Sequence, residues 1–180
     1  MTVRANKPAF NIREKLTELK ADNSKVIPAW NLRPNSSANE SVSGDNIMGW
    51  TDNTTNSRET VCFLAGGVTL GPASGNTRNG GDSTGRIIVP VSGLYKVWCT
   101  IRCENTPGAG NIYLNAAGVG AVARQHVEVW ARYNYAHGFM SQILHLGAGE
   151  HIEWRVNIST SSTISGYNDT VNWTGGHLIT

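Results

Sequence analysis

The second half of the chain alternates apolar and polar residues with a period of two. Between residues 93 and 103 the apolar positions are Tyr95, Val97, Cys99, Ile101 and Cys103, and the positions between them are Lys96, Trp98, Thr100 and Arg102. Successive side chains of a strand point to opposite faces, so this pattern predicts a strand with one buried face. Ile152, Trp154, Val156 and Ile158 repeat the pattern and predict a second such strand.

Further short strands are expected between clear turn sequences such as Pro107-Gly108, Gly147-Ala148-Gly149 and Ser165-Gly166. The expected strands are Ile47–Trp50, Thr60–Leu64, Gly85–Val89, Gly93–Cys103, Gly110–Asn115, Ala121–Tyr133, His137–Leu146, His151–Ser159 and Thr170–Ile179. Strands at this spacing predict an all-β fold, either an antiparallel two-sheet sandwich or a jelly roll, over residues 46–180.

The first 22 residues have a different pattern. Asn11 and Glu14 form a capping box, and Ile12, Leu16 and Leu19 then recur on one helical face, which predicts a helix over 12–20. A helix this short is marginal in water unless its apolar face is covered. We interpret residues 1–22 as a docking arm and 23–45 as a connector in which Pro28 and Pro34 interrupt regular structure.

Two surfaces are available to cover the arm. It folds back over an edge of its own sandwich, or it docks on another subunit or a larger assembly. We favour the second, with Phe10, Ile12, Leu16 and Leu19 as the docking residues.

The composition of the chain argues against several functional classes. The net charge is +2 with scattered Lys and Arg, so no basic surface for nucleic acid is expected. No stretch approaches the roughly 18 apolar residues that span a bilayer, and the N-terminus lacks the apolar core of a signal peptide, so a soluble protein without a membrane partner is expected. The three cysteines are expected to be buried thiols.

Three segments resemble the jelly-roll superfamily of tumour necrosis factor and the globular head of complement. The strand entry is Pro90-Val91-Ser92-Gly93-Leu94-Tyr95, the hairpin is Leu144 to Ile152, and the closing strand is Trp173 to Ile179. The resemblance implies an antiparallel jelly-roll β-sandwich like that of tumour necrosis factor, and a homotrimer. Glu150 and Trp173 replace the usual Asp and Phe, so the calcium site of some complement-like heads is not expected.

The arm has a resemblance of its own. Arg4 to Leu16 reads Arg-Ala-Asn-Lys-Pro-Ala-Phe-Asn-Ile-Arg-Glu-Lys-Leu and is similar to an N-terminal segment shared by structural proteins of tailed bacteriophages. This resemblance implies that residues 1–22 bind the major capsid protein or another virion protein.

Outward aromatics are the candidate interface residues. Trp98 and Trp130 lie opposite the predicted core faces of their strands and have arginines nearby, which is typical of protein interfaces. With the trimer that the resemblance implies, the candidates are Trp98, Trp130 and Tyr133, with Leu178 and Ile179 near the threefold axis. The alternative is that this opposite face is buried within the same chain.

Catalytic motifs are missing from the sequence. It has no Gly-x-Ser-x-Gly elbow, no HExxH helix and no phosphate loop, and His126-x-Glu128 lacks the paired histidines of a cupin metal site. We therefore expect neither an enzyme nor a metal or other cofactor.

These patterns lead to one hypothesis and one alternative. The hypothesis is a trimeric capsid decoration or cement protein of a bacteriophage virion, assembled in the host cytoplasm and anchored by its arm. The alternative is a tail fibre, spike or adaptor component that binds host glycan through loop residues such as Trp50, Tyr167 and the loop 66–85. The absence of repeats or a coiled-coil shaft argues against a fibre.

Overall fold

The computed structural model describes residues 26–35, 40–52, 62–74, 77–78, 84–104, 108–116, 120–129, 135–164 and 172–180. The predicted arm and its helix lie outside these residues, as do Trp130, Tyr133 and Tyr167. The described chain consists of strands and their connections, without a helix. The strands are β1 (Ala29–Pro34), β2 (Glu40–Met48), β3 (Trp50–Thr51), β4 (Phe63–Ala65), β5 (Thr69–Gly71), β6 (Thr77–Arg78), β7 (Arg86–Ile88), β8 (Gly93–Glu104), β9 (Gly108–Ala116), β10 (Gly120–Val129), β11 (Tyr135–Leu146), β12 (His151–Ile164) and β13 (Trp173–Leu178).

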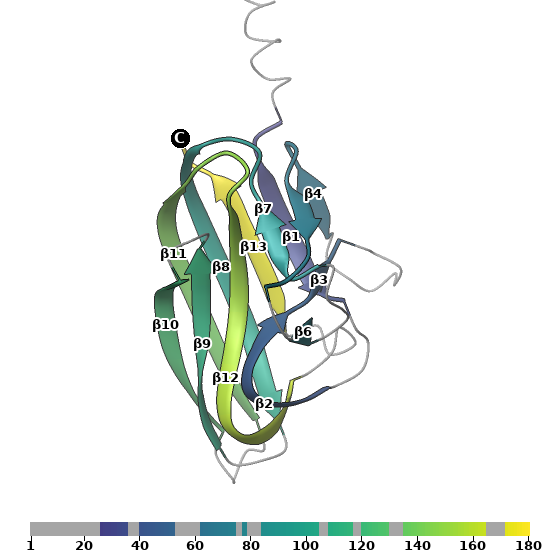
Figure 1. Cartoon of the computed structure of the whole chain (residues 1–180), viewed down its shortest axis with the longest axis vertical. Coiled ribbons are helices and arrows are strands. Elements are labelled where there is room, and N and C mark those ends of the chain that lie inside the picture. The colour runs from purple at the N-terminus through teal and green to yellow at the C-terminus, as the bar shows by residue number, and fades with distance from the viewer. Residues whose placement is uncertain are drawn as a thin grey trace, which may run out of the picture.

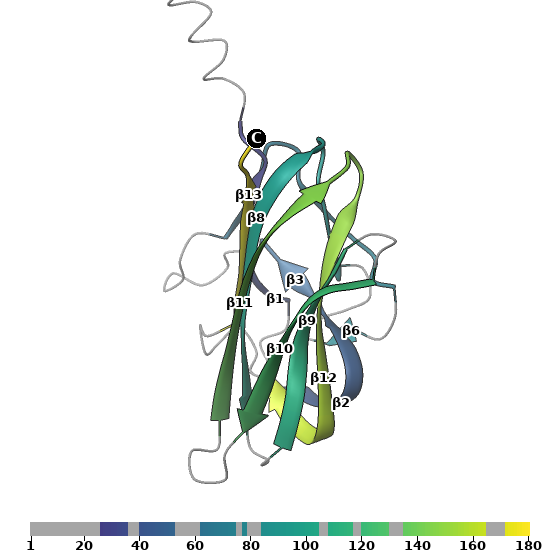
Figure 2. The same ribbon diagram turned by 90° about the vertical axis from the view of Figure 1, so that its left-hand side faces the viewer.

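The strands form two facing layers (Figures 1 and 2). One layer has the order β11-β8-β13-β1-β4. The other has the order β10-β9-β12-β2, and β7 extends it by pairing with the start of β12. These pairings are antiparallel, whereas β2 and the short β6 run parallel. The predicted jelly-roll β-sandwich is confirmed.

Strand β12 connects the two layers. Its first half pairs with β9 and β2, and a register shift follows between Ile158 and Ser162. Its last residues, Thr163 and Ile164, pair both with β2 and with β8 of the other layer. At the opposite edge β10 and β11 run side by side (Figure 2). The sandwich is therefore curled toward closure, which protects strand edges.

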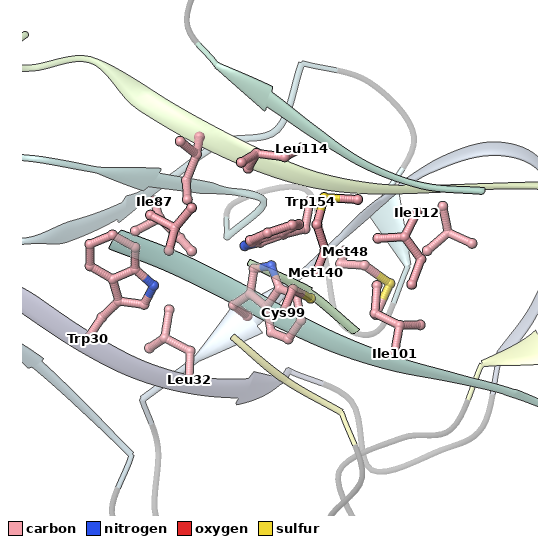
Figure 3. Packing of buried hydrophobic residues seen from close by; sticks show 14 of the residues in the cluster. Trp30, Leu32, Met48, Ile87, Cys99, Ile101, Ile112, Leu114, Met140 and Trp154 are labelled. Carbon is pink, nitrogen blue, oxygen red and sulfur yellow. The ribbon is translucent and has the colours of Figure 1, made fainter. Parts of the chain in front are cut away.

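The core lies between the layers and contains the residues that the alternation predicts. Tyr95, Val97, Cys99, Ile101 and Cys103 of β8 are buried, and so are Ile152, Trp154, Val156 and Ile158 of β12. Figure 3 shows side chains from both layers packed against one another. The Tyr95 hydroxyl donates a hydrogen bond of 2.8 Å to the Val91 carbonyl, so this buried phenol has its polar atom satisfied.

The expected connector contains part of the sandwich. Strand β1 and the first half of β2 both fall within 23–45, and Trp30 and Leu32 of β1 are core residues. Pro28 precedes β1 and Pro34 is its last residue, so the prolines delimit a strand where we expected them to prevent one. The β-structure thus begins at Ala29, well before residue 46.

The expected long loop at 66–85 also contains strands. Gly66 and Gly67 form the turn between β4 and β5, and both have the positive φ that glycine adopts readily. Strand β5 then pairs with β7. The chain therefore turns at these glycines from β4, which pairs with β1, to β5, which belongs with β7 to the other layer.

Candidate functional site

The outer face of the β11-β8-β13 layer carries an exposed apolar surface. On β8 the core residues alternate with Leu94, Lys96 and Trp98, which point away from the core. On β11 the register places Ser141 opposite Trp98 and Ile143 opposite Lys96. We call Leu94, Lys96, Trp98, Phe139, Ser141, Ile143 and His177 the outer patch.

Trp98 belongs to the outer patch, and a glycine on the neighbouring strand leaves room for its ring. Gly175 of β13 is its cross-strand partner, and a Cβ at that position would overlap the indole ring. The ring also meets His177 edge-on, with ring centroids 5.9 Å apart and an interplanar angle of 63°. The absence of a side chain at Gly175 thus lets the indole lie over β13.

A hollow of about 500 Å³ lies over these strands, lined by Lys96, Trp98, Phe139, Ser141 and His177. Phe139 is 59% exposed, Ile143 is 61% exposed and Leu94 is 41% exposed. Single exposed apolar residues are common, but a group of them around a hollow typically marks a binding surface. The outer patch is therefore the candidate functional site, and its chemistry suits an apolar partner surface.

The residues predicted for the trimer interface differ in how far the structure exposes them. Trp98 lies outside the core as predicted, and Ile179 is 44% exposed near the end of the chain. Leu178 instead packs against the core of its own sandwich, because it lies beside Tyr95 on the inner side of β13. Trp130 and Tyr133 lie outside the described residues.

Phe139 and Ile143 were missed by the sequence analysis, although the sequence contains a signal for them. In β11 the inward positions include Met140, Leu144 and Leu146, while Phe139 and Ile143 occupy the other face. A strand that carries large apolar residues on both faces is often covered on both sides. The second cover of β11 is not supplied by the described part of this chain.

The prediction that Trp50 contacts glycan is wrong. Trp50 is 0% exposed, because it begins β3, pairs with Pro34 of β1 and belongs to the core. Its backbone N–H also donates to the Thr84 carbonyl at 3.2 Å. The second glycan candidate, Tyr167, lies outside the described residues.

A polar cluster on β12 has a structural explanation. Glu153 is 3% exposed, and its carboxylate accepts hydrogen bonds from Ser74 N (2.9 Å), Ser74 Oγ (2.7 Å) and Arg86 Nε (3.1 Å). Burial raises the pKa of Glu153, but the bonds from Ser74 and Arg86 outweigh burial and hold the pKa below its ordinary value. Burial and the charge of Arg86 lower the pKa of neighbouring His151. Through these hydrogen bonds the Glu153 carboxylate holds the connection that carries Ser74 against the sheet.

The remaining candidate chemistry is limited in the described residues. Cys62, Cys99 and Cys103 are buried, and burial raises the pKa of the Cys99 thiol well above its ordinary value. Within the described ranges, no three His, Cys, Asp or Glu side chains gather as they would around a metal ion. No helix with the length and apolarity to cross a membrane occurs in that part of the chain.

Comparison with known proteins identifies the fold. No family model and no curated protein matches the chain. Among solved structures, the crystal structure of murine APRIL at pH 5.0 is similar, with a TM-score of 0.58 and 12% identity over 85% of this chain and 99% of that chain. APRIL is a jelly roll of the tumour necrosis factor family, so the expected resemblance is confirmed at the level of fold. At this identity the comparison identifies the fold alone, because one fold hosts many functions.

Proposed function

We propose that the protein is a non-enzymatic, trimeric structural component of a bacteriophage virion, which decorates the capsid through residues 1–22. The observation that carries the assembly part of this proposal is the outer patch. Three copies would cover Trp98, Phe139 and Ile143 of each other and remove apolar area from water, which is the main driving force of stable association. The jelly-roll fold shared with APRIL supports this arrangement.

The position of the chain ends supports docking by several arms together. Leu178 N donates to the Pro28 carbonyl at 2.9 Å, and Leu94 N donates to the Thr180 carbonyl at 2.9 Å. The start of the described chain therefore lies beside its C-terminal end, where Val26 and Ile27 are exposed. A threefold axis sets equivalent points at one level, so the three chains enter their sandwiches at the same end of the trimer.

Three linked arms bind more tightly than one. Once one arm is bound, the others search a small volume, and the overall affinity rises by orders of magnitude without any new contact. The resemblance of Arg4 to Leu16 to the N-terminal segment of phage structural proteins supports a virion protein as the surface that receives the arms.

The experiment compares the full chain with a chain lacking residues 1–22 on virions that lack the protein. We expect the full chain to sediment with the particles and the truncated chain to remain in the supernatant as a trimer. A truncated chain that reaches full occupancy on the particles would contradict docking through the arm.

Copy number per virion separates the capsid from the tail. Hundreds of copies per particle are expected for a capsid decoration protein, and a few tens would favour the tail fibre, spike or adaptor alternative. Quantitative mass spectrometry of purified virions, with the major capsid protein as the internal standard, gives this number.

A further inference from the structure

A polar hollow lies on the outer face of the second layer, away from the outer patch. It is formed by three adjacent strands, β2, β9 and β12, which stand in front in Figure 1. Five residues line it: Asp45 of β2, Tyr113 and Asn115 of β9, and Arg155 and Asn157 of β12. They alternate along their strands with the core residues Ile112, Leu114 and Val156, so they share the face that points away from the core.

The strand register brings these side chains together. Tyr113 is the cross-strand partner of Arg155, and Asp45 is the partner of Asn157. Gly44 has a φ of 67°, and its carbonyl accepts a hydrogen bond of 3.1 Å from the buried Asn46 side chain. The backbone on both sides of Asp45 is therefore held in place, on the edge of the hollow.

Charge is balanced in the polar hollow. Arg155 Nη2 lies 3.0 Å from Asp45 Oδ2, and the other three lining residues are uncharged at neutral pH. An anionic ligand would compete with Asp45 for the Arg155 guanidinium, and a cationic ligand would be repelled by Arg155. The site therefore favours a neutral ligand.

Its hydrogen-bonding groups are mixed. The amides of Asn115 and Asn157 each donate and accept, Asp45 accepts and Arg155 donates. Neighbouring hydroxyls on a ring also both donate and accept, and Tyr113 adds an aromatic ring that is apolar on its face. This combination matches a polyhydroxylated ring, whereas an apolar ligand would leave several of these polar groups without partners.

Size limits the ligand further. The hollow has a volume of about 210 Å³, smaller than the roughly 300–1,000 Å³ of pockets that enclose drug-sized ligands. It lies on one face of the sheet and is open to solvent. A single sugar ring at the end or along the side of a longer chain fits these dimensions.

We propose that the polar hollow formed by Asp45, Tyr113, Asn115, Arg155 and Asn157 binds one ring of a neutral saccharide. The site lies on the layer opposite the outer patch. It does not depend on whether the protein decorates a capsid or belongs to a tail.

The test uses the full chain and saturation-transfer NMR followed by calorimetric titration. The probes are the methyl glycosides of glucose, galactose, mannose and N-acetylglucosamine, with glucuronic acid as the charged comparison. We expect saturable binding of at least one neutral probe. Asn157→Ala and Asn115→Ala should each weaken it about three- to tenfold, the effect of one lost hydrogen bond.

Two further variants make the result specific. Asp45→Asn keeps the shape of the side chain but removes its charge, so it should weaken neutral-sugar binding without unfolding the sheet. Ser141→Ala, on the opposite layer, should leave binding unchanged. The proposal is wrong if none of the neutral probes binds, if glucuronic acid binds best, or if Asn157→Ala, Asn115→Ala and Asp45→Asn bind as well as the unmodified chain.

Discussion

At the scale of single residues, Glu153 is a charged group that is almost completely buried. It lies on the outer face of β12, beside the polar hollow, yet it is buried because the connection carrying Ser74 covers it. Its partner Arg86 is the first residue of β7, which pairs with β12. The carboxylate therefore links a connection and two strands.

We expect Glu153→Gln to lower the free energy of unfolding at neutral pH by about 1.5–3 kcal/mol, the range for a hydrogen bond to a charged group. The pKa of Glu153 is held below its ordinary value of 4.5. Its stabilisation is therefore complete above pH 4.5 and is lost as pH falls through the lower folded-state pKa. The difference between the two proteins should shrink over that acidic range.

Urea unfolding from pH 7 to pH 3 measures this difference. Asp52→Asn, which changes an exposed carboxylate, serves as the control and should stay within about 0.5 kcal/mol of the unmodified protein. A difference between Glu153→Gln and the unmodified protein that remains constant down to pH 3 would contradict the low pKa of Glu153.

At the scale of elements, two adjacent glycines of β13 make room for indole rings on the two faces of the strand. Gly175 makes room for Trp98 on the outer side of the strand, and Gly176 makes room for Trp30 on the core side. A Cβ at either position would overlap the neighbouring indole. The two indoles have different freedom, because Trp30 is enclosed and Trp98 borders solvent.

Gly176→Ala should therefore destabilise the protein by about 1–3 kcal/mol, the usual cost of extra volume in a packed core. Gly175→Ala should cost less, because Trp98 can swing outward. Urea unfolding of both variants at pH 7 measures the two losses, and each serves as the control for the other. Equal losses would mean that Trp98 is as tightly held as Trp30.

The strands that the sequence predicts well are those with one buried face. In β8 burial follows the alternation residue by residue, and in β12 it does so except at Glu153, which the connection carrying Ser74 covers. Strand β1 could not be predicted in this way, since its prolines resemble breakers until its position between β13 and β4 is known. Pairing between distant segments decides such cases.

The candidate site was predictable only in part for a related reason. Trp98 follows from the alternation of β8, but Phe139 and Ile143 join it through the pairing of β11 with β8. Trp50 ends an expected strand, and the pairing of that segment with β1 places it in the core. A local pattern describes one strand, whereas a surface is made by several.

At the scale of the whole molecule, the two layers have separate chemistry. The β11-β8-β13 layer presents the apolar outer patch, and the opposite layer presents polar side chains along β2, β9 and β12. Assembly through the outer patch and ligand binding in the polar hollow would thus involve residues of different layers of one sandwich.

The trimer itself is tested by placing charge on the outer patch. Phe139→Asp with Ile143→Asp would put two carboxylates where association requires desolvation, and burying unpaired charge is strongly unfavourable. We expect the unmodified chain to sediment with three times the mass of one chain and the double variant to sediment as a folded monomer. Val91→Asp, in the exposed loop before β8, is the matched control and should remain trimeric. An unmodified chain that is monomeric at micromolar concentration, or a double variant that stays trimeric, would mean that the outer patch is not the assembly surface.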